Sequence, residues 1–263
     1  MELGLHGKVA LVAASSQGLG RAIATELATE GASLVMNARG EGRLRETASG
    51  IAAASGVRVV PVSGDVSRTD DVARLAAAAL DAFGRVDVLV TNSGGPPPGT
   101  FESTSAEAWK AAADVLLTSA VELIRPVLPG RKERRFGRIL NITSITVKQP
   151  VENLILSNAL RAAVTGMAKT LANEVAPFGI TVNNLLPGYT RTERLVALAE
   201  AHARRSGTPV EEWSARLIRD IPAGRLGDPR ELAALAAFLA SERAGYITGQ
   251  SIAVDGGWIR GLV

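Results

Sequence analysis

Short apolar runs alternate with longer amphipathic stretches along the whole 263-residue chain, and this alternation restricts the possible folds more than any other feature. The apolar runs are continuous, which is typical of parallel strands that are covered on both faces. They occupy residues 9–13, 32–36, 57–62, 86–90, 138–142, 180–186 and 251–254, and helical spacing of apolar residues appears at 20–30, 43–54, 69–83, 105–128, 156–176 and 229–241. The sequence therefore predicts an α/β fold with one doubly wound, seven-stranded parallel sheet.

No linker-like, low-complexity or repeated segment divides the chain, so we expect a single domain over residues 1–263. Residues 191–222 interrupt the alternation with a helical insertion that is rich in Arg, Ala and Glu. An insertion near the carboxyl ends of the strands can serve as a lid over a site. It can equally be a peripheral helix that only packs, and the sequence leaves both interpretations open.

Composition excludes several classes of protein. The chain has no Cys and only two His, so disulfides, thiolate sites and a metal site are not expected. The net charge is +3, and the one dense basic run, residues 131–135, is interpreted as a solvated helix end rather than a surface for nucleic acid. No signal-peptide pattern and no apolar run of about 20 residues is present, so we expect a cytoplasmic protein that binds neither membrane nor nucleic acid.

The turn after the first predicted strand is built from small residues and opens a helix, with the sequence AASSQGLG at 13–20. Such a turn lets backbone amides and a helix N-terminus approach a diphosphate. The second strand ends in Ala38-Arg39, where an NAD site would place a carboxylate for the adenosine ribose. An arginine suits a 2′-phosphate, so NADP(H) is favoured and NAD(H) stays possible. The alternative is that Arg39 is an ordinary surface residue at the end of a strand.

Four further motifs follow the same turn along the chain. They are Asp65-Val66, the strand end Asn92-Ser93-Gly94, Pro187-Gly188 followed by Thr192, and the closing segment TGQSIAVDGG at 248–257. Together with the turn they resemble the short-chain dehydrogenase/reductase family, nearest its 3-oxoacyl-[acyl-carrier-protein] reductase branch. The resemblance covers almost the full length and implies a Rossmann-like domain.

The resemblance implies a set of cofactor-binding residues, which come from the turn and from the ends of the strands. They are Ala14, Ser16, Gln17, Gly18, Leu19, Gly20, Arg39, Asp65, Val66, Asn92, Ser93, Gly94, Arg161, Pro187, Gly188, Thr190 and Thr192. Ala14 departs from the family pattern, because it replaces the first glycine of the turn. If this position has a positive φ, alanine is strained there, and if φ is negative the methyl group only fills space.

The catalytic pattern of the family is largely replaced. The family's tetrad is Asn, Ser, Tyr and Lys; Ser144 stands at the serine position, while Leu116, Ser157 and Arg161 stand at the other three. The segment SNALRAAVTGMAKTLANE at 157–174 matches the family's helix without a gap, which fixes this register.

These replacements change the proton chemistry. Reduction of a carbonyl needs a hydride and a proton, and a phenol with a pKa of about 10 can supply the proton when an ammonium lies nearby. The Ser157 hydroxyl is a far weaker acid, and Arg161 keeps the positive charge but is too basic to relay a proton. Water, Tyr189 or Lys148 are the candidate proton donors. Tyr189 could instead be an apolar wall of the pocket, and Lys148 an exposed loop charge.

Three functions are compatible with this pattern. The favoured one is an NAD(P)(H)-dependent oxidoreductase with a rearranged active site that acts on a small carbonyl or alcohol. In that case Ser157 and Arg161 could bind a carboxylate or phosphate of the substrate, or only pack against the cofactor ribose. The second is an inactive NADP(H)-binding sensor or assembly subunit. The third is a ligand-binding protein without cofactor, which the preserved cofactor motifs disfavour.

The resemblance also implies an assembly. Helices at 105–128 and 156–176 pair across a two-fold axis in this family, and both are long and rich in alanine in this chain. We therefore expect a homotetramer or a homodimer.

Overall fold

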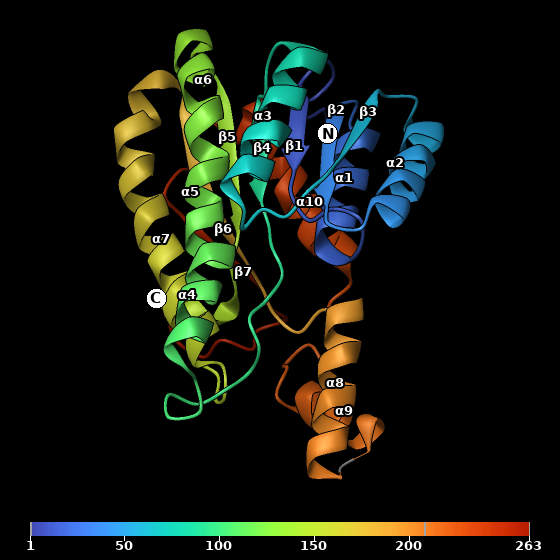
Figure 1. Cartoon of the computed structure of the whole chain (residues 1–263), viewed down its shortest axis with the longest axis vertical. Coiled ribbons are helices and arrows are strands. Elements are labelled where there is room, and N and C mark those ends of the chain that lie inside the picture. The colour runs from blue at the N-terminus through green and yellow to red at the C-terminus, as the bar shows by residue number, and fades with distance from the viewer. Residues whose placement is uncertain (1, 208, 263) are drawn as a thin grey trace.

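The seven predicted strands form one parallel sheet in the computed structural model, which describes residues 2–207 and 209–262. The strands are β1 (Val9–Val12), β2 (Ser33–Ala38), β3 (Val59–Ser63), β4 (Val88–Thr91), β5 (Gly137–Ile142), β6 (Ile180–Pro187) and β7 (Ser251–Val254). Their order is β3-β2-β1-β4-β5-β6-β7 (Figure 1), so the predicted α/β, doubly wound architecture is confirmed. The strand order reverses between β1 and β4, and ligands of such sheets bind outside the carboxyl ends of the strands at that point.

Helices cover both faces of the sheet and account for the continuous apolar runs. One face is covered by α1 (Gly18–Thr29), α2 (Glu41–Ser55) and α10 (Pro229–Ala240), the other by α3 (Thr69–Phe83), α5 (Ser119–Ile124) and α7 (Ile155–Val175). Neighbouring residues of one strand point to opposite faces, so Ala10 and Val12 pack on the first layer and Leu11 on the second. Most strand positions are therefore apolar on both faces, as the continuous runs predict.

The segment predicted as one helix over 105–128 is divided. It begins with α4 (Ala106–Ala113), which the Ser105 hydroxyl caps, and passes through a π-helical turn at Asp114–Thr118 into α5. A 3₁₀ turn at Arg125–Val127, where Pro126 lacks the amide hydrogen a helix needs, then leads into α6 (Leu128–Arg134). π-helical turns occur preferentially at functional sites, and this one carries Leu116.

The interpretation of residues 131–135 as a solvated helix end is wrong for Arg131. Its side chain is fully buried under α6, and its Nε donates to the Asp87 carbonyl at 3.3 Å. A Cβ on Gly137 would lie 2.6 Å from the Arg131 Cδ, so the glycine makes the room for this side chain. Burial lowers the Arg131 pKa to about 9, although Asp87 opposes the shift.

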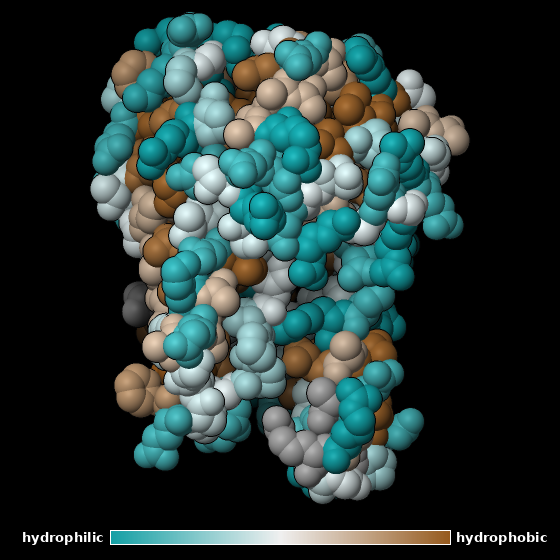
Figure 2. All heavy atoms as spheres, in the orientation of Figure 1, coloured by the Kyte–Doolittle hydropathy of each residue, from teal (hydrophilic) through white to brown (hydrophobic). Residues whose placement is uncertain are grey.

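The insertion at 191–222 forms two helices beyond the carboxyl ends of the strands, α8 (Glu193–Ser206) and α9 (Val210–Arg219). They project from the body of the molecule (Figure 1), and in the space-filling view a notch separates them from the segment around α4 (Figure 2). The part of the chain that the structure describes contains no helix that is long and apolar enough to cross a membrane.

Candidate functional site

The turn that follows β1 is tied to the ends of two neighbouring strands. The Ser15 amide donates to the Asn37 carbonyl at the end of β2 at 2.8 Å, and the Ser15 hydroxyl donates to the Val12 carbonyl at 2.8 Å. From the end of β4, the Asn92 side-chain amide donates to the Ala14 carbonyl at 3.2 Å. The turn is thus fixed at the position where the strand order of the sheet reverses.

Two glycines and one alanine give the turn its shape. Gly18 has φ +55°, and a Cβ on Gly20 would lie 2.2 Å from the Ala14 carbonyl oxygen, so only glycine fits there. Ala14 itself has φ +47°, which meets the condition for strain stated above. For an L-residue with a side chain, that left-handed conformation costs roughly 1 kcal/mol.

The N-terminus of α1 is available to an anion. The N-cap residue Gln17 makes no capping hydrogen bond, and its side-chain oxygen instead accepts from Arg43. The first amides of a helix have no partner within the helix, and together with the helix dipole they attract phosphate groups. The shape and charge of this turn therefore fit the diphosphate of a dinucleotide.

The ends of β2 and β3 carry the side chains predicted to face the adenosine. Arg39 follows β2, is exposed, and forms no hydrogen bond or ion pair within residues 2–207 and 209–262. Asp65 accepts from the Ser67 amide at 3.0 Å and from the Ser67 hydroxyl at 2.8 Å, which shapes the loop after β3. Val66 packs against the α3 side of the core. The Arg39 guanidinium is therefore free to bind an added anion.

Other predicted cofactor residues lie on the turn after β1 and just after β4. Ser16 accepts from the Thr47 hydroxyl through its carbonyl, and Leu19 packs against the core. Ser93 donates to the Gly94 carbonyl, and a Cβ on Gly94 would meet nothing within 4 Å.

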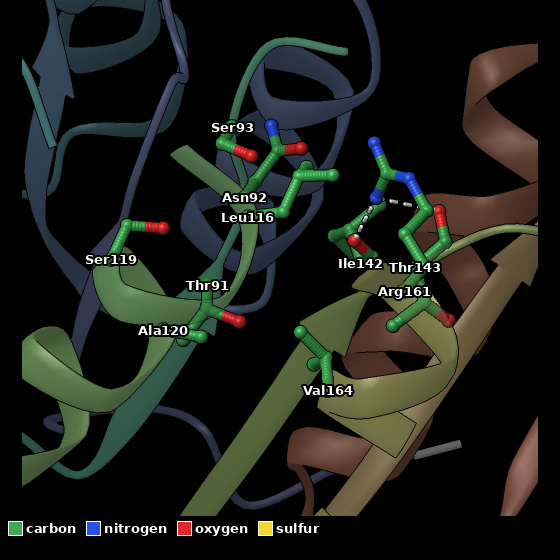
Figure 3. Close-up of a pocket in the computed structure, with 10 residues that line it drawn as sticks. All are labelled: Thr91, Asn92, Ser93, Leu116, Ser119, Ala120, Ile142, Thr143, Arg161 and Val164. Carbon is green, nitrogen blue, oxygen red and sulfur yellow. Dashed lines mark hydrogen bonds between the residues drawn. The ribbon is translucent and has the colours of Figure 1, made fainter. Parts of the chain in front are cut away.

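Arg161 is the charged residue of a small cavity at the carboxyl ends of β4 and β5. Its Nη1 donates to the Ile142 and Thr143 carbonyls at 2.9 and 3.0 Å (Figure 3). The lining residues are Thr91, Asn92, Ser93, Leu116, Ser119, Ala120, Ile142, Thr143, Arg161 and Val164. Burial lowers the Arg161 pKa to about 10, and the positive charge of Arg194 adds to this shift. The structure thus brings Leu116 and Arg161 into one cavity with Asn92.

Ser144 and Ser157 have different surroundings. Ser144 is half-buried just beyond β5, and its Oγ accepts from the Thr146 amide at 3.2 Å, which leaves its hydrogen free to donate. Ser157 is only 8% exposed on α7 and does not line the cavity around Arg161. Of the two residues that could bind a substrate anion or pack against the cofactor ribose, only Arg161 lies at the cavity wall.

The two other candidate proton donors differ in burial. The Tyr189 ring packs edge-on against Trp258, with 5.8 Å between ring centroids, and burial raises its pKa, with a smaller contribution from Asp220. A phenol with a raised pKa is a weaker acid, and this packing matches the interpretation of Tyr189 as a wall. Lys148 is exposed on the loop after the 3₁₀ turn at Ile145–Val147.

The segment after β6 connects the sheet to α8. The Gly188 amide donates to the Val254 carbonyl at 3.0 Å, which continues the pairing of Pro187 with the edge strand. Thr190 is buried and donates to the Gly188 carbonyl, and the Thr192 hydroxyl accepts from the Leu195 amide and caps α8.

The first turn of α8 contacts two segments, the turn after β1 and the loop after β4. We call the space between these two segments the crevice. A Cβ on Gly18 would lie 3.6 Å from the Glu193 Oε2, and this carboxylate is 3.9 Å from the Arg21 guanidinium of α1. The next residue, Arg194, donates through Nη2 to the Pro96 carbonyl at 3.0 Å. Sequence reasoning did not single out either residue, although both directly follow Thr192.

A chain of buried hydrogen bonds crosses four strands beneath the cavity. Thr91 donates to Asn141 at 2.7 Å, Asn141 donates to Asn184 at 3.0 Å, and Asn184 donates to Ser251 at 3.1 Å. This polar ladder links the cavity wall on β4 to the edge strand β7.

The chain is similar to known proteins over nearly its whole length. The profile of the family described as Enoyl-(Acyl carrier protein) reductase matches residues 13–259. The chain belongs to the short-chain dehydrogenase/reductase family. The resemblance stated from the sequence is thereby confirmed.

Relatives and solved structures are similar over nearly the whole length. The chain is 36% identical to the 3-oxoacyl-[acyl-carrier-protein] reductase FabG of Vibrio cholerae, covering 97% of this chain and 98% of the relative. It is 34% identical to the D-beta-hydroxybutyrate dehydrogenase of Cupriavidus necator, covering 97% and 99%. The structure of L-sorbose reductase from Gluconobacter frateurii, complexed with NADPH and L-sorbose, matches with a TM-score of 0.95 at 35% identity, with full coverage of both chains.

Proposed function

We propose that this short-chain dehydrogenase/reductase is an NADPH-dependent oxidoreductase that interconverts a carbonyl and an alcohol on a small molecule. One observation carries the proposal: the diphosphate-shaped turn at Gly18 and the Ser144–Arg161 end of β5 lie along the same edge of one sheet. The relatives named above are reductases and dehydrogenases, so the comparisons favour an enzyme and give no support to an inactive sensor or assembly subunit.

The residues present can hold the cofactor. The turn at 14–20 and the N-terminus of α1 would bind the diphosphate, and Arg39 would bind a 2′-phosphate. NADPH is also the nucleotide in the complex of L-sorbose reductase, which supports NADP(H) over NAD(H). When bound, the nicotinamide supplies or accepts the hydride.

Ser144 and Arg161 would act on the reacting carbonyl. The Ser144 hydroxyl has its hydrogen free and would donate to the carbonyl oxygen, while its own oxygen is held by the Thr146 amide. The Arg161 guanidinium, held by two backbone carbonyls, would stabilise the negative charge that develops on that oxygen. The proton would come from solvent water, because neither Tyr189 nor Lys148 lines the cavity beside Arg161.

Two measurements test this function. NADPH fluorescence titration of the unmodified protein and of Arg39→Ala should show a loss of NADPH affinity of about tenfold or more, with the weaker NADH affinity unchanged. Stopped-flow mixing of the NADPH complex with a panel of ketones should show oxidation of NADPH. Tight binding of NADPH without hydride transfer to any ketone would overturn the enzymatic proposal, and a preference for NADH would overturn the role of Arg39.

We also propose that the chain forms a single domain with α8–α9 as a lid, and that it assembles as a homotetramer or homodimer. The contacts of Glu193 and Arg194 with both sides of the crevice support the lid. The outward face of α7 carries the exposed small residues Ala162, Ala163 and Gly166, which allow close helix packing. Light scattering would show a monomer if the assembly is wrong. The cytoplasmic location stays a prediction.

A further inference from the structure

Arg161 is held in place by neutral partners only. Its Nη1 donates to the Ile142 and Thr143 carbonyls, and among residues 2–207 and 209–262 neither Nη2 nor Nε has a hydrogen-bond partner and no carboxylate forms an ion pair with it. A guanidinium carries five N–H donors in a planar fork that matches a carboxylate or phosphate. Most of this donor capacity is therefore unused at the cavity wall.

Arg194, on the first turn of α8, is a second guanidinium, and it is held against the loop that continues from the cavity-lining residue Ser93. Its Nη2 donates to the Pro96 carbonyl, and a Cβ on Gly95 would lie 2.7 Å from the same nitrogen and 3.1 Å from the Arg194 Cζ. The guanidinium therefore lies directly on the backbone of the loop after β4. Across the described part of the chain no carboxylate pairs with Arg194, because the adjacent Glu193 lies near Arg21 instead.

The two positive charges act on each other without a counter-charge. The Arg194 charge is one cause of the lowered Arg161 pKa, and burial lowers the pKa of both arginines. Two partly desolvated cations that repel each other are costly unless an anion lies between them. An anionic ligand would relieve the repulsion and use the free donors of both forks.

The location separates this charge pair from the diphosphate turn. Arg161 is bound at the end of β5, where Ser144 follows, and Arg194 lies on the loop that continues from Asn92-Ser93-Gly94. The N-terminus of α1 is faced by Thr192 and Glu193 of the same segment, not by either arginine. An anion between the arginines would thus be near the reacting carbonyl rather than at the diphosphate.

We propose that Arg161 and Arg194 form an anion site that selects substrates in which a carboxylate or phosphate lies close to the reacting carbonyl. This inference rests on the proposed function and narrows its substrate class. Arg194 is then a specificity-determining residue supplied by the lid, and Arg161 serves both the anion and the developing charge on the carbonyl oxygen.

The test uses two matched pairs of substrates that differ by charge. Acetoacetate and methyl acetoacetate share one ketone, and dihydroxyacetone phosphate and dihydroxyacetone share another. With NADPH, we expect kcat/KM for the anionic member of at least one pair to exceed that of its neutral member by about tenfold to a hundredfold. The pair that shows the difference tells whether the anion is a carboxylate or a phosphate.

Variants at one helix then assign the effect. Arg194→Gln should reduce that ratio to near one, because the KM of the anionic substrate rises much more than the KM of the neutral substrate or the Kd of NADPH. Arg194→Lys should keep part of the ratio, because it retains the charge but loses the fork. Arg204→Gln, which removes an exposed arginine from the same α8, should change nothing.

Three results would overturn the inference. The first is an equal kcat/KM within both pairs. The second is a ratio that survives Arg194→Gln. The third is a loss of NADPH affinity in Arg194→Gln with both substrates slowed alike, which would assign Arg194 to the diphosphate.

A binding measurement separates this inference from the proposed function. If no ketone oxidises NADPH, the proposed function fails. Calorimetric titration of acetoacetate and of dihydroxyacetone phosphate into the NADPH complex then still tests whether the anion site exists. Binding of one anion at millimolar concentrations that Arg194→Gln abolishes would support the anion site. Absence of binding by both anions would overturn it.

Discussion

Single residues carry strain in this molecule where the sequence pattern of the family is broken. Ala14 adopts φ +47°, in the region that favours glycine, because the Ala13 amide is held by the Val90 carbonyl before it and the Ser15 amide by the Asn37 carbonyl after it. The methyl group therefore opposes a conformation that the surrounding contacts impose.

Ala14→Gly should raise the free energy of unfolding by about 0.5 kcal/mol, because the relief of roughly 1 kcal/mol of left-handed strain exceeds a cost of about 0.5 kcal/mol in chain entropy. Urea unfolding of the cofactor-free protein measures the change. Ala53→Gly, at an exposed position inside α2, should lower the same quantity by about 1 kcal/mol. Equal losses in both variants would show that the turn tolerates alanine without strain.

Arg131 is the second residue under stress, since it is buried with Nη1 and Nη2 lacking partners in the described residues. Burial lowers its pKa to about 9, well below the ordinary value of an arginine, so the folded state disfavours the charged form. Below pH 9 the destabilisation is fully present. Above pH 9 the unfolded chain binds more protons than the folded protein, so stability rises with pH.

Arg131→Met should therefore raise the free energy of unfolding at pH 7 by on the order of 1 kcal/mol, since Asp87 keeps Arg85 and Arg134 as partners. The gain over the unmodified protein should shrink as the pH rises above 9. Urea titrations at pH 7, 9 and 10 follow the difference. A gain that stays constant across these values would contradict the lowered pKa.

Elements are joined at the site by the ladder from Thr91 through Asn141 and Asn184 to Ser251. Its members are direct register partners on the adjacent strands β4, β5, β6 and β7, so their side chains lie next to one another. Asn141 is only 1% exposed, so water cannot reach Thr91 and Asn184 to replace its hydrogen bonds if the side chain is removed.

Asn141→Leu should lower the free energy of unfolding by about 3 kcal/mol, because it leaves the Thr91 hydroxyl and the Asn184 carbonyl oxygen buried without partners. Thr181→Val is the matched control on β6, since the Thr181 hydroxyl is buried and has no partner in the described residues. It should leave stability unchanged or raise it. Thermal unfolding of both variants decides, and equal losses would mean that the ladder adds nothing specific.

The sequence predicts elements well where burial on two faces repeats along the chain. All seven strands follow from continuous apolar runs, and their ends shift by at most two residues because hydrogen bonding, not hydropathy, sets them. The division of 105–128 was missed, since the π-helical turn depends on packing around Leu116. The inward turn of Arg131 was missed because the space above Gly137 exists only in the fold.

In the candidate site too, residues in local sequence patterns were predicted and residues placed by long-range contacts were missed. The turn, Arg39 and Arg161 could be located from spacing along the chain, whereas Arg194 could not. Its contact with Pro96 joins residues 98 positions apart, and no local pattern encodes such a pair.

At the scale of the whole molecule, α8–α9 spans the two halves of the crevice through adjacent side chains. Glu193 lies near the turn that would receive the diphosphate, and Arg194 lies on the loop at the carbonyl end. A shift of α8 would therefore change the surroundings of the turn and of the loop after β4 together.

Glu193→Gln should tighten NADPH binding about threefold, because it removes a negative charge beside the α1 N-terminus, and the gain should fall as salt is added. Fluorescence titrations at low and high ionic strength measure it. Glu200→Gln, which neutralises another carboxylate of α8, should leave the affinity unchanged. Weaker binding in Glu193→Gln would mean that this carboxylate holds the helix in its binding position.

The two contacts of α8 also predict the order in which cofactor and substrate bind and leave. A dinucleotide that binds at the turn would displace the Glu193 carboxylate, whereas the smaller molecule would bind beside Arg194 and leave that carboxylate in place. The dinucleotide is then first in and last out, and steady-state inhibition by products should show competition between the oxidised and reduced dinucleotides alone.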